Sequence, residues 1–221
     1  MPEGASSSPR DNGSGSASRI VSIELMGAAG QKVRIHLADG SFFIVHAEIF
    51  AAGPLSAGSA LDEPLLQSLK VRSEQVFARD AALRLLSRAA QTRRGLLRKL
   101  RSRGFSKEAS AFALNRMIEL GYVDDRVFAE SWTRFRIATR KEGWKSLYRG
   151  LLRGGVPREV AEEVLDQACT EDVELDQARR LTHGVSPRQA VSKLTARGFR
   201  SRTIARILSE MRREAPRDPE E

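Results

Sequence analysis

The spacing of apolar and polar residues divides the chain into two parts. Between Arg19 and residue 47, apolar residues alternate with polar ones at a period of two, which is typical of strands that bury one face. Between Ser73 and Arg213, apolar residues recur every three or four positions, which is typical of amphipathic helices. The sequence therefore predicts a mainly α-helical chain that is preceded by a small antiparallel β extension.

The β extension is expected to contain three short antiparallel strands, the last two of which form a hairpin. The dipeptide Asp39-Gly40 between those two is preferred in two-residue type I′ turns. With that turn, Leu37 faces Phe42 on one apolar face, and Phe43 lies on the opposite face. Such a small sheet is marginal alone, so we expect it to pack on the helices that follow. The expected strands cover residues 19–26, 31–38 and 41–47.

The helical part repeats itself along the chain. Residues 96–117, 147–168 and 190–211 can be aligned, and each segment carries a glycine followed by an apolar residue at the same place. Glycine is suited to the left-handed position that ends a helix, so each segment is expected to hold two helices. The glycines are Gly104, Gly155 and Gly198, and the residues expected to start the second helices are Ser106, Pro157 and Ser201.

A longer amphipathic stretch precedes each of these helix pairs, at about residues 74–90, 125–140 and 171–183. Three helices used three times are the signature of a solenoid-like architecture. We therefore expect three tandem three-helix repeats in an elongated array. The expected divisions are a disordered tail at 1–18, a β extension with linker and short helix at 19–72, repeats at 73–121, 122–170 and 171–213, and an acidic tail at 214–221.

The middle repeat contains the residues that first suggest chemistry. Asp124 and Asp125 are candidates for acid–base or metal chemistry, but they lie where a helix must begin, which favours capping over catalysis. Phe128, Trp132 and Phe135 fall at i, i+4 and i+7, which is typical of a core stripe. The structural motif of this repeat is assigned to Gly121, Asp124, Asp125, Phe128, Trp132, Gly143, Leu147, Leu151 and Gly155.

Other motifs of catalysis or cofactor binding are missing from the sequence. Cys169 is the single cysteine, so neither an internal disulfide nor a thiolate zinc cluster can form. No phosphate loop, dinucleotide fingerprint or Gly-x-Ser-x-Gly elbow is present. We expect a non-enzymatic protein without a cofactor or metal. No apolar run approaches the ~20 residues that cross a bilayer, so no membrane association and a cytoplasmic location are expected.

The chain is strongly basic, with a net charge of +9 and a pI near 10.4, which indicates an anionic partner. Trp144 and Tyr148 are the aromatic residues best placed to stack on bases. With so few aromatic residues, binding to single- and double-stranded DNA is expected to be weak, salt-dependent and not sequence-specific. The candidate basic face comprises Arg93, Arg94, Arg98, Lys99, Arg103, Arg136, Arg140, Lys141, Lys145, Arg149, Arg153, Lys193 and Arg197.

The motif of the middle repeat is similar to that of a known family. It runs Gly121-Tyr122-Val123-Asp124-Asp125, Phe128-Ala129, Trp132, Arg136 and Gly143, then Leu147, Leu151 and Gly155-Val156. In this it resembles the RecX family, which regulates the RecA recombinase. Residues 82–105 resemble the first unit of the family, and residues 33–50 resemble the amino-terminal extension of its longer members. Gly95 and Gly150 depart from the pattern, because an acidic residue is common at both places.

The resemblance implies a three-repeat helical protein with a basic face that docks in the groove of RecA–DNA filaments. We expect the protein to be a monomer. In the family, such docking restrains filament extension, and with it ATP hydrolysis, strand exchange and co-protease activity, in DNA repair, recombination and the SOS response. Two other interpretations remain open. The chain could be a helix-turn-helix-like protein that binds duplex DNA directly, or a helical scaffold whose charge is incidental.

Overall fold

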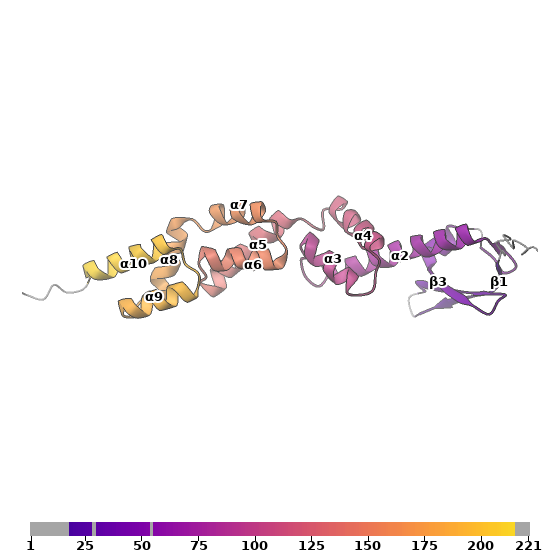
Figure 1. Cartoon of the computed structure of the whole chain (residues 1–221), viewed down its shortest axis with the longest axis horizontal. Helices are drawn as coiled ribbons and strands as arrows, with labels where there is room; N and C mark the ends of the chain where they lie inside the picture. Colours follow the sequence, from indigo (N-terminus) through magenta and orange to yellow (C-terminus); the bar gives the residue numbers. More distant parts are fainter. Residues whose placement is uncertain (1–17, 28–29, 54, 215–221) are drawn as a thin grey trace, which may run out of the picture. The chain divides into compact units, whose positions relative to one another are not determined.

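A computed structural model describes residues 18–27, 30–53 and 55–214 of the chain (Figure 1). The chain divides into two compact units, an amino-terminal unit that ends at Ala78 and a helical unit that begins at Arg79. A mainly helical fold with an amino-terminal antiparallel sheet is confirmed. The tails expected at 1–18 and 214–221 lie outside the described residues, except for Ser18 and Glu214.

The helices and strands of the described residues follow one another in this order. They are β1 (Ser18–Met26), β2 (Lys32–Leu37), β3 (Phe42–His46), α1 (Ala47–Ala51), β4 (Ala60–Leu61), α2 (Glu63–Leu86), α3 (Arg93–Arg101), α4 (Lys107–Glu119), α5 (Asp125–Arg140), α6 (Trp144–Gly154), α7 (Arg158–Ala168), α8 (Glu171–Thr182), α9 (Pro187–Ala196) and α10 (Ser201–Glu214).

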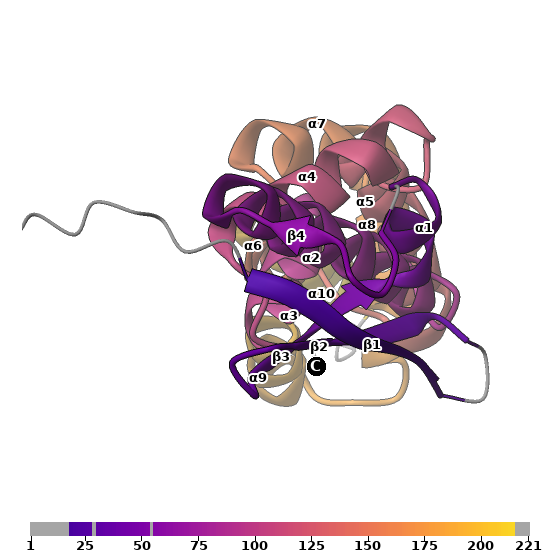
Figure 2. The same cartoon turned by 90° about the vertical axis from the view of Figure 1, so that its right-hand side faces the viewer.

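The sheet of the amino-terminal unit is antiparallel, with the strand order β3-β2-β1-β4 (Figure 2). The short strand β4, which the sequence analysis did not predict, pairs with the start of β1. One face of the sheet packs on α2 through Leu66, Leu69 and Val76. The two helices expected at this point form the single helix α2, because no glycine or proline interrupts residues 65–86. The contacts of the sheet with α2 confirm the prediction that the sheet packs on the helix that follows it.

The hairpin between β2 and β3 has a longer loop than predicted. Gly40 has a positive φ of 84° and its N–H donates to the carbonyl of Leu37, while Leu37 N–H donates to the carbonyl of Ser41. These bonds describe a turn followed by a bulge, with glycine in the left-handed position. The carboxylate of Asp39 accepts hydrogen bonds from the hydroxyl and N–H of Ser41, which lower the pKa of Asp39 and hold this loop closed.

The longer loop shifts the register by one residue, so the predicted pairing of Leu37 with Phe42 is wrong. Phe42 lies opposite His36, and Phe43 lies opposite Ile35. Because side chains alternate along a strand, this shift exchanges the two faces of β3. Phe43 is buried at 8% exposure, whereas Phe42 is 57% exposed.

The register can be tested by two alanine substitutions in neighbouring positions. Phe43→Ala is expected to destabilise the amino-terminal unit by about 3 kcal/mol, because it leaves a cavity in the core, and Phe42→Ala by less than about 1 kcal/mol. Hydrogen exchange of the β2 and β3 amides measures both effects. Faster exchange in Phe42→Ala than in Phe43→Ala would contradict the register.

The helical unit contains the expected repeats, each built on signals that lie in its own sequence. Gly104, Gly155 and Gly198 have positive φ values of 90°, 95° and 75°, so all three end their helices as predicted. Ser106 caps α4, with its hydroxyl accepting from Ala109 N–H. Pro157 stands at the cap of α7 rather than in its first turn, and Ser201 is the first residue of α10.

Consecutive repeats join through their second helices, α3, α6 and α9. At the first junction, the Thr92 hydroxyl donates to the carbonyl of Gly154, so the start of α3 meets the end of α6. At the second junction, Gly143 N–H and Lys145 N–H donate to the carbonyls of Arg197 and Gly198, so the start of α6 meets the end of α9. The second helices therefore follow one another end to end along the helical unit (Figure 1).

A carboxylate from the following repeat caps the second helix at each junction. Asp124 alone caps α5, through Arg126 N–H and Val127 N–H, whereas the buried Asp125 accepts from Arg93 N–H at the start of α3. The prediction that Asp125 serves the start of its own helix is therefore corrected. At the second junction, Glu174 accepts from Trp144 N–H in the same way.

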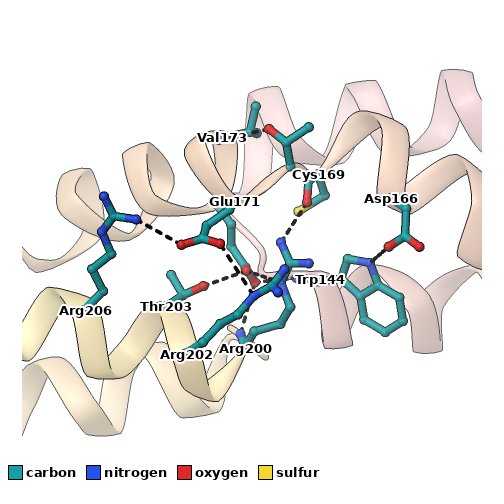
Figure 3. A network of polar contacts seen from close by, with 11 residues as sticks. Trp144, Asp166, Cys169, Glu171, Val173, Arg200, Arg202, Thr203 and Arg206 are labelled. Atoms are coloured by element: carbon teal, nitrogen blue, oxygen red, sulfur yellow. Dashed lines mark hydrogen bonds and ion pairs between the residues drawn. The ribbon is translucent and has the colours of Figure 1, made fainter.

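Glu174 also joins α8 to α10 within the third repeat. Its fully buried carboxylate accepts from Arg200 N–H, Arg200 Nε and the Thr203 hydroxyl, at 3.1, 2.5 and 2.8 Å. Arg200 donates a further bond to the carbonyl of Cys169, so Arg200, Thr203 and Trp144 converge at this junction (Figure 3). A buried carboxylate held by four donors fixes the start of α6 relative to α8 and α10.

Candidate nucleic-acid interface

The second helices of the repeats differ in composition from the other helices. They contain five basic residues in α3, three in α6 and two in α9, and none of the three contains an acidic residue. The first and third helices mix both signs, and α7 is predominantly acidic. Positive charge in the helical unit is thus concentrated on the elements that stack end to end.

The basic residues also differ in their partners. Arg126 pairs with Glu163 at 2.8 Å, and Arg179 pairs with Glu210 at 2.8 Å, where the guanidinium holds the pKa of Glu210 below its ordinary value. In the part of the chain that the structure describes, by contrast, no Lys or Arg of α3, α6 or α9 forms an ion pair. Internal carboxylates therefore do not account for these cations.

Each second helix carries a cation in its first turn, where a positive charge is unfavourable for the helix. Arg94, Lys145 and Arg188 each occupy the second helical position of α3, α6 and α9. A cation near a helix amino terminus opposes the helix dipole by about 0.3–1 kcal/mol. The same unfavourable placement recurs in all three repeats, which indicates a role in binding an anion rather than in stabilising the fold.

The exposed cations line up along each second helix. Arg94 and Arg98 are four residues apart on α3, and Lys145, Arg149 and Arg153 are four residues apart on α6, so each set lies on one helical face. Because the two junctions use equivalent contacts, the helices that carry these cations follow one another. We name this surface the second-helix cation row, which consists of Arg94, Arg98, Lys145, Arg149, Arg153 and Arg188.

Several predicted basic residues lie on this row or beside it. Arg93, Lys99 and Lys193 are on α3 and α9 outside the row, and Lys99 Nζ donates to the Gln91 side chain. Arg103 donates to the carbonyl of Lys99, in the turn after α3. Arg140 and Lys141 lie exposed at the end of α5, where a guanidinium N–H of Arg197 donates to the Arg140 carbonyl at 2.7 Å.

Arg136 is held in a structural arrangement. Its guanidinium forms two hydrogen bonds with Glu142, at 2.6 and 2.9 Å, and lies 5.0 Å from the ring centre of Trp132. A bidentate pair on an aromatic face leaves little of the fork for another anion. Arg136 therefore supports the loop between α5 and α6.

Sequence reasoning missed Arg188, although a signal for it was present. In the alignment of the three repeats, Arg188 corresponds to Arg94 and Lys145. The junction contacts show that the helices carrying these corresponding positions follow one another. The alignment therefore shows that the three positions are equivalent, and the end-to-end stacking of the second helices makes this equivalence relevant to binding.

The aromatic residues expected to stack on bases make contacts within the protein instead. Trp144 and Tyr148 stack on each other with ring centres 4.9 Å apart. The indole N–H of Trp144 donates to Asp166, and the Tyr148 hydroxyl donates to Glu162, both on α7 (Figure 3 shows the Trp144–Asp166 bond). Their ring edges nevertheless line a cavity of about 450 Å³ beside Lys145.

The predicted core stripe of α5 is wrong at its last position. Phe128 and Trp132 pack partly buried against the core of the middle repeat, but Phe135 is 62% exposed. The buried face of α5 runs instead through the small residues Ala129 and Thr133. The helix therefore presents an additional apolar face that its own core does not use.

Two findings on the described residues concern metal binding and the single cysteine. Among them, no group of three or more His, Cys, Asp or Glu residues could hold a metal ion. Burial raises the pKa of the Cys169 thiol to about 12, so the thiol is uncharged and unreactive near neutral pH. Nor does any helix in this part of the chain have the length and apolar character of a membrane span.

Comparison with known proteins identifies the repeats. The model of the first three-helix domain of RecX matches residues 78–117, and that of the second matches residues 124–165. A protein named regulatory protein RecX from Thermus thermophilus is 42% identical over 118 residues, which cover 53% of this chain and 80% of the relative. The chain belongs to the RecX family. A regulatory protein RecX from Trichlorobacter lovleyi is 34% identical over 145 residues, covering 59% of this chain and 92% of the relative.

Solved RecX structures share the fold. A crystal structure of regulatory protein RecX superposes with a TM-score of 0.66 at 23% identity, covering 87% of this chain and 99% of the other. RecX from Lactobacillus salivarius superposes with a TM-score of 0.57 at 25% identity, covering 63% and 97%. Family members carry the name of regulatory proteins, and the third helix set, α8 to α10, lies beyond both matched domains.

Proposed function

We propose that this RecX-family protein binds RecA–DNA filaments and restrains their extension, and with it ATP hydrolysis, strand exchange and co-protease activity. The observation that carries the proposal is the second-helix cation row, whose exposed cations have no carboxylate partner among the described residues. Phosphate groups at regular spacing are the anions that such a row fits, since neutralising them releases counterions from the nucleic acid.

The arrangement of the row favours backbone contacts over base reading. Arg and Lys side chains that meet phosphates position a protein without specifying sequence. The fixed junctions hold the cations of different repeats in one geometry, so their weak contacts add without a large cost in ordering. Preference for one state of the filament is enough to regulate it, and no catalytic residue is needed.

The alternative of a helix-turn-helix protein that reads duplex DNA is less well supported. Such proteins insert the start of a recognition helix into the major groove. The first turns of α3 and α6 are occupied by Asp125 and Glu174 from the following repeats. The third helix α7 is acidic and unsuited to the groove.

We propose further that the protein acts as a monomer in the cytoplasm, without a cofactor, in DNA repair and recombination. The repeat boundaries 73–121, 122–170 and 171–213 remain our proposal for its functional divisions. Each of the last two spans holds three helices that share one core.

ATP hydrolysis by RecA on single-stranded DNA tests the proposed function. Substoichiometric amounts of the protein are expected to lower the steady-state rate, because each bound copy blocks extension by many protomers. The control is the same titration with bovine serum albumin. An unchanged rate, together with tight binding to one duplex sequence, would replace this proposal with the helix-turn-helix alternative.

A further inference from the structure

A groove at the first junction is lined by aromatic and apolar side chains. It has a volume of about 370 Å³ and lies between the first repeat and α5. Three of its side chains are largely exposed, namely Tyr122 at 59%, Val127 at 58% and Phe135 at 62%. Phe128 and Trp132 form its half-buried wall. We call this surface the aromatic groove.

The aromatic groove is not required by the core of the middle repeat. Phe128 and Trp132 pack against that core, but Val127 and Phe135 on the same helix are exposed and lie outside the core cluster. Isolated exposed apolar residues are ordinary on protein surfaces. A contiguous set that lines a hollow, however, is typical of a binding surface.

The wall of the groove is built to keep its shape. The Trp132 ring lies against Gly150 so closely that a Cβ at residue 150 would overlap it. Trp132 also carries the guanidinium of Arg136 on its ring, and that guanidinium is fixed by Glu142. A pocket with fixed walls binds with a smaller loss of side-chain entropy.

Two polar side chains of the groove are already engaged. The Gln91 amide donates to the carbonyl of Ala89 and accepts from Lys99, and the Asp124 carboxylate accepts from two N–H groups of α5. Recognition of a nucleobase edge needs donors and acceptors that are available. Because most of the remaining lining is apolar or aromatic, the groove fits an apolar side chain better than a base.

The charge near the groove indicates which groups lie next to the apolar side chain on the partner. Arg88 and Arg93 flank the lining residues Ala90 and Gln91 in the sequence. Both cations are exposed, and neither forms an ion pair within the described residues. The complementary partner has an apolar anchor with carboxylates next to it.

We propose that the aromatic groove binds the protein component of the filament, through an apolar side chain bordered by carboxylates on the recombinase surface. This inference rests on the proposed function and divides it between two surfaces. The second-helix cation row holds DNA phosphates, and the aromatic groove holds protein. A recombinase side chain bound in the groove makes the protein prefer filaments to DNA without recombinase. Phosphate contacts alone cannot supply this preference.

The double variant Tyr122→Ser/Phe135→Ser tests this division. Its concentration for half-inhibition of RecA ATP hydrolysis is expected to rise by about tenfold or more, as for loss of an interface hot spot. Its affinity for a fluorescent oligo-dT is expected to stay within about twofold of the wild type, since no phosphate contact is removed. The matched control is Leu83→Ser/Phe112→Ser, which removes two exposed apolar residues outside the groove and should change neither value.

The outcomes separate this inference from the proposed function. Parallel losses of oligo-dT affinity and inhibition would assign the groove to bases and overturn the inference. Undiminished inhibition by the double variant would also overturn it. A wild-type protein that does not affect RecA would refute the proposed function, and the groove assignment with it. The conservative variant Tyr122→Phe should inhibit like the wild type, and circular dichroism checks that all variants are folded.

Discussion

Replacing Glu174 by alanine is expected to lower the free energy of unfolding of the helical unit by about 3–5 kcal/mol. The carboxylate is completely buried and receives donors from α6 and α10, so that α6, α8 and α10 are joined at this one residue. Its removal leaves Arg200, which is 17% exposed, as a buried charge without a counterion. The Trp144 N–H and the Thr203 hydroxyl lose their acceptor at the same time.

Glu171→Ala is the matched control for this prediction. Glu171 lies on the same helix and contacts Arg202 and Arg206, but its side chain is 43% exposed. Exposed pairs contribute about 1 kcal/mol or less, so the control should lose no more than that. Urea denaturation followed by tryptophan fluorescence measures both variants, since Trp144 lies at the junction. Equal losses in the two variants would show that Glu174 does not hold the junction.

Reversing the charge of the three α6 cations should have the largest effect on DNA binding. The variant Lys145→Glu/Arg149→Glu/Arg153→Glu removes half of the second-helix cation row and adds repulsion in its place. The slope of log affinity against log salt is expected to become shallower by about 2 to 3, because each lost contact with single strands or duplex contributes about 0.7 or 0.9. Fluorescence anisotropy with oligo-dT and with duplex DNA measures this slope.

A control with the same change in net charge separates position from total charge. Arg116→Glu/Arg212→Glu/Arg213→Glu reverses three exposed cations on the third helices α4 and α10. It should retain most of the affinity and the original slope, since these residues lie off the row. If both variants lose affinity equally, net charge rather than the row accounts for the binding.

Helix ends and repeats could be predicted because their signals are local. The left-handed glycines Gly104, Gly155 and Gly198 end helices through contacts within a few residues, and all three are confirmed. The third helix set was found by self-similarity alone, and its helices α8, α9 and α10 begin and end within a few residues of the predicted limits.

Register and junctions could not be predicted, because they depend on contacts that the local pattern does not record. The type I′ turn at Asp39-Gly40 was a reasonable choice of loop, but the hydrogen bonds of Asp39 with Ser41 favour the longer one. Asp125 has the sequence context of a cap for its own helix. Its carboxylate instead accepts a hydrogen bond from the N–H of Arg93, which lies 32 residues earlier in the chain.

The candidate site was predictable in composition and not in arrangement. Counting basic residues locates the charge, but it gives Arg136 the same weight as Arg149. Only the structure shows that Glu142 already holds the first, whereas the second lies exposed on an acid-free helix. Arg188 illustrates the converse, a single cation that gains significance through its alignment with two others.

The most direct test compares three proteins in one assay of ATP hydrolysis by RecA on single-stranded DNA. Wild type and the Arg116/Arg212/Arg213 reversal are expected to lower the rate at substoichiometric amounts. The Lys145/Arg149/Arg153 reversal is expected to leave the rate unchanged at the same concentrations, while its helicity by circular dichroism equals that of the wild type. Inhibition by this α6 variant as strong as that of the wild type would contradict the role assigned to the second-helix cation row.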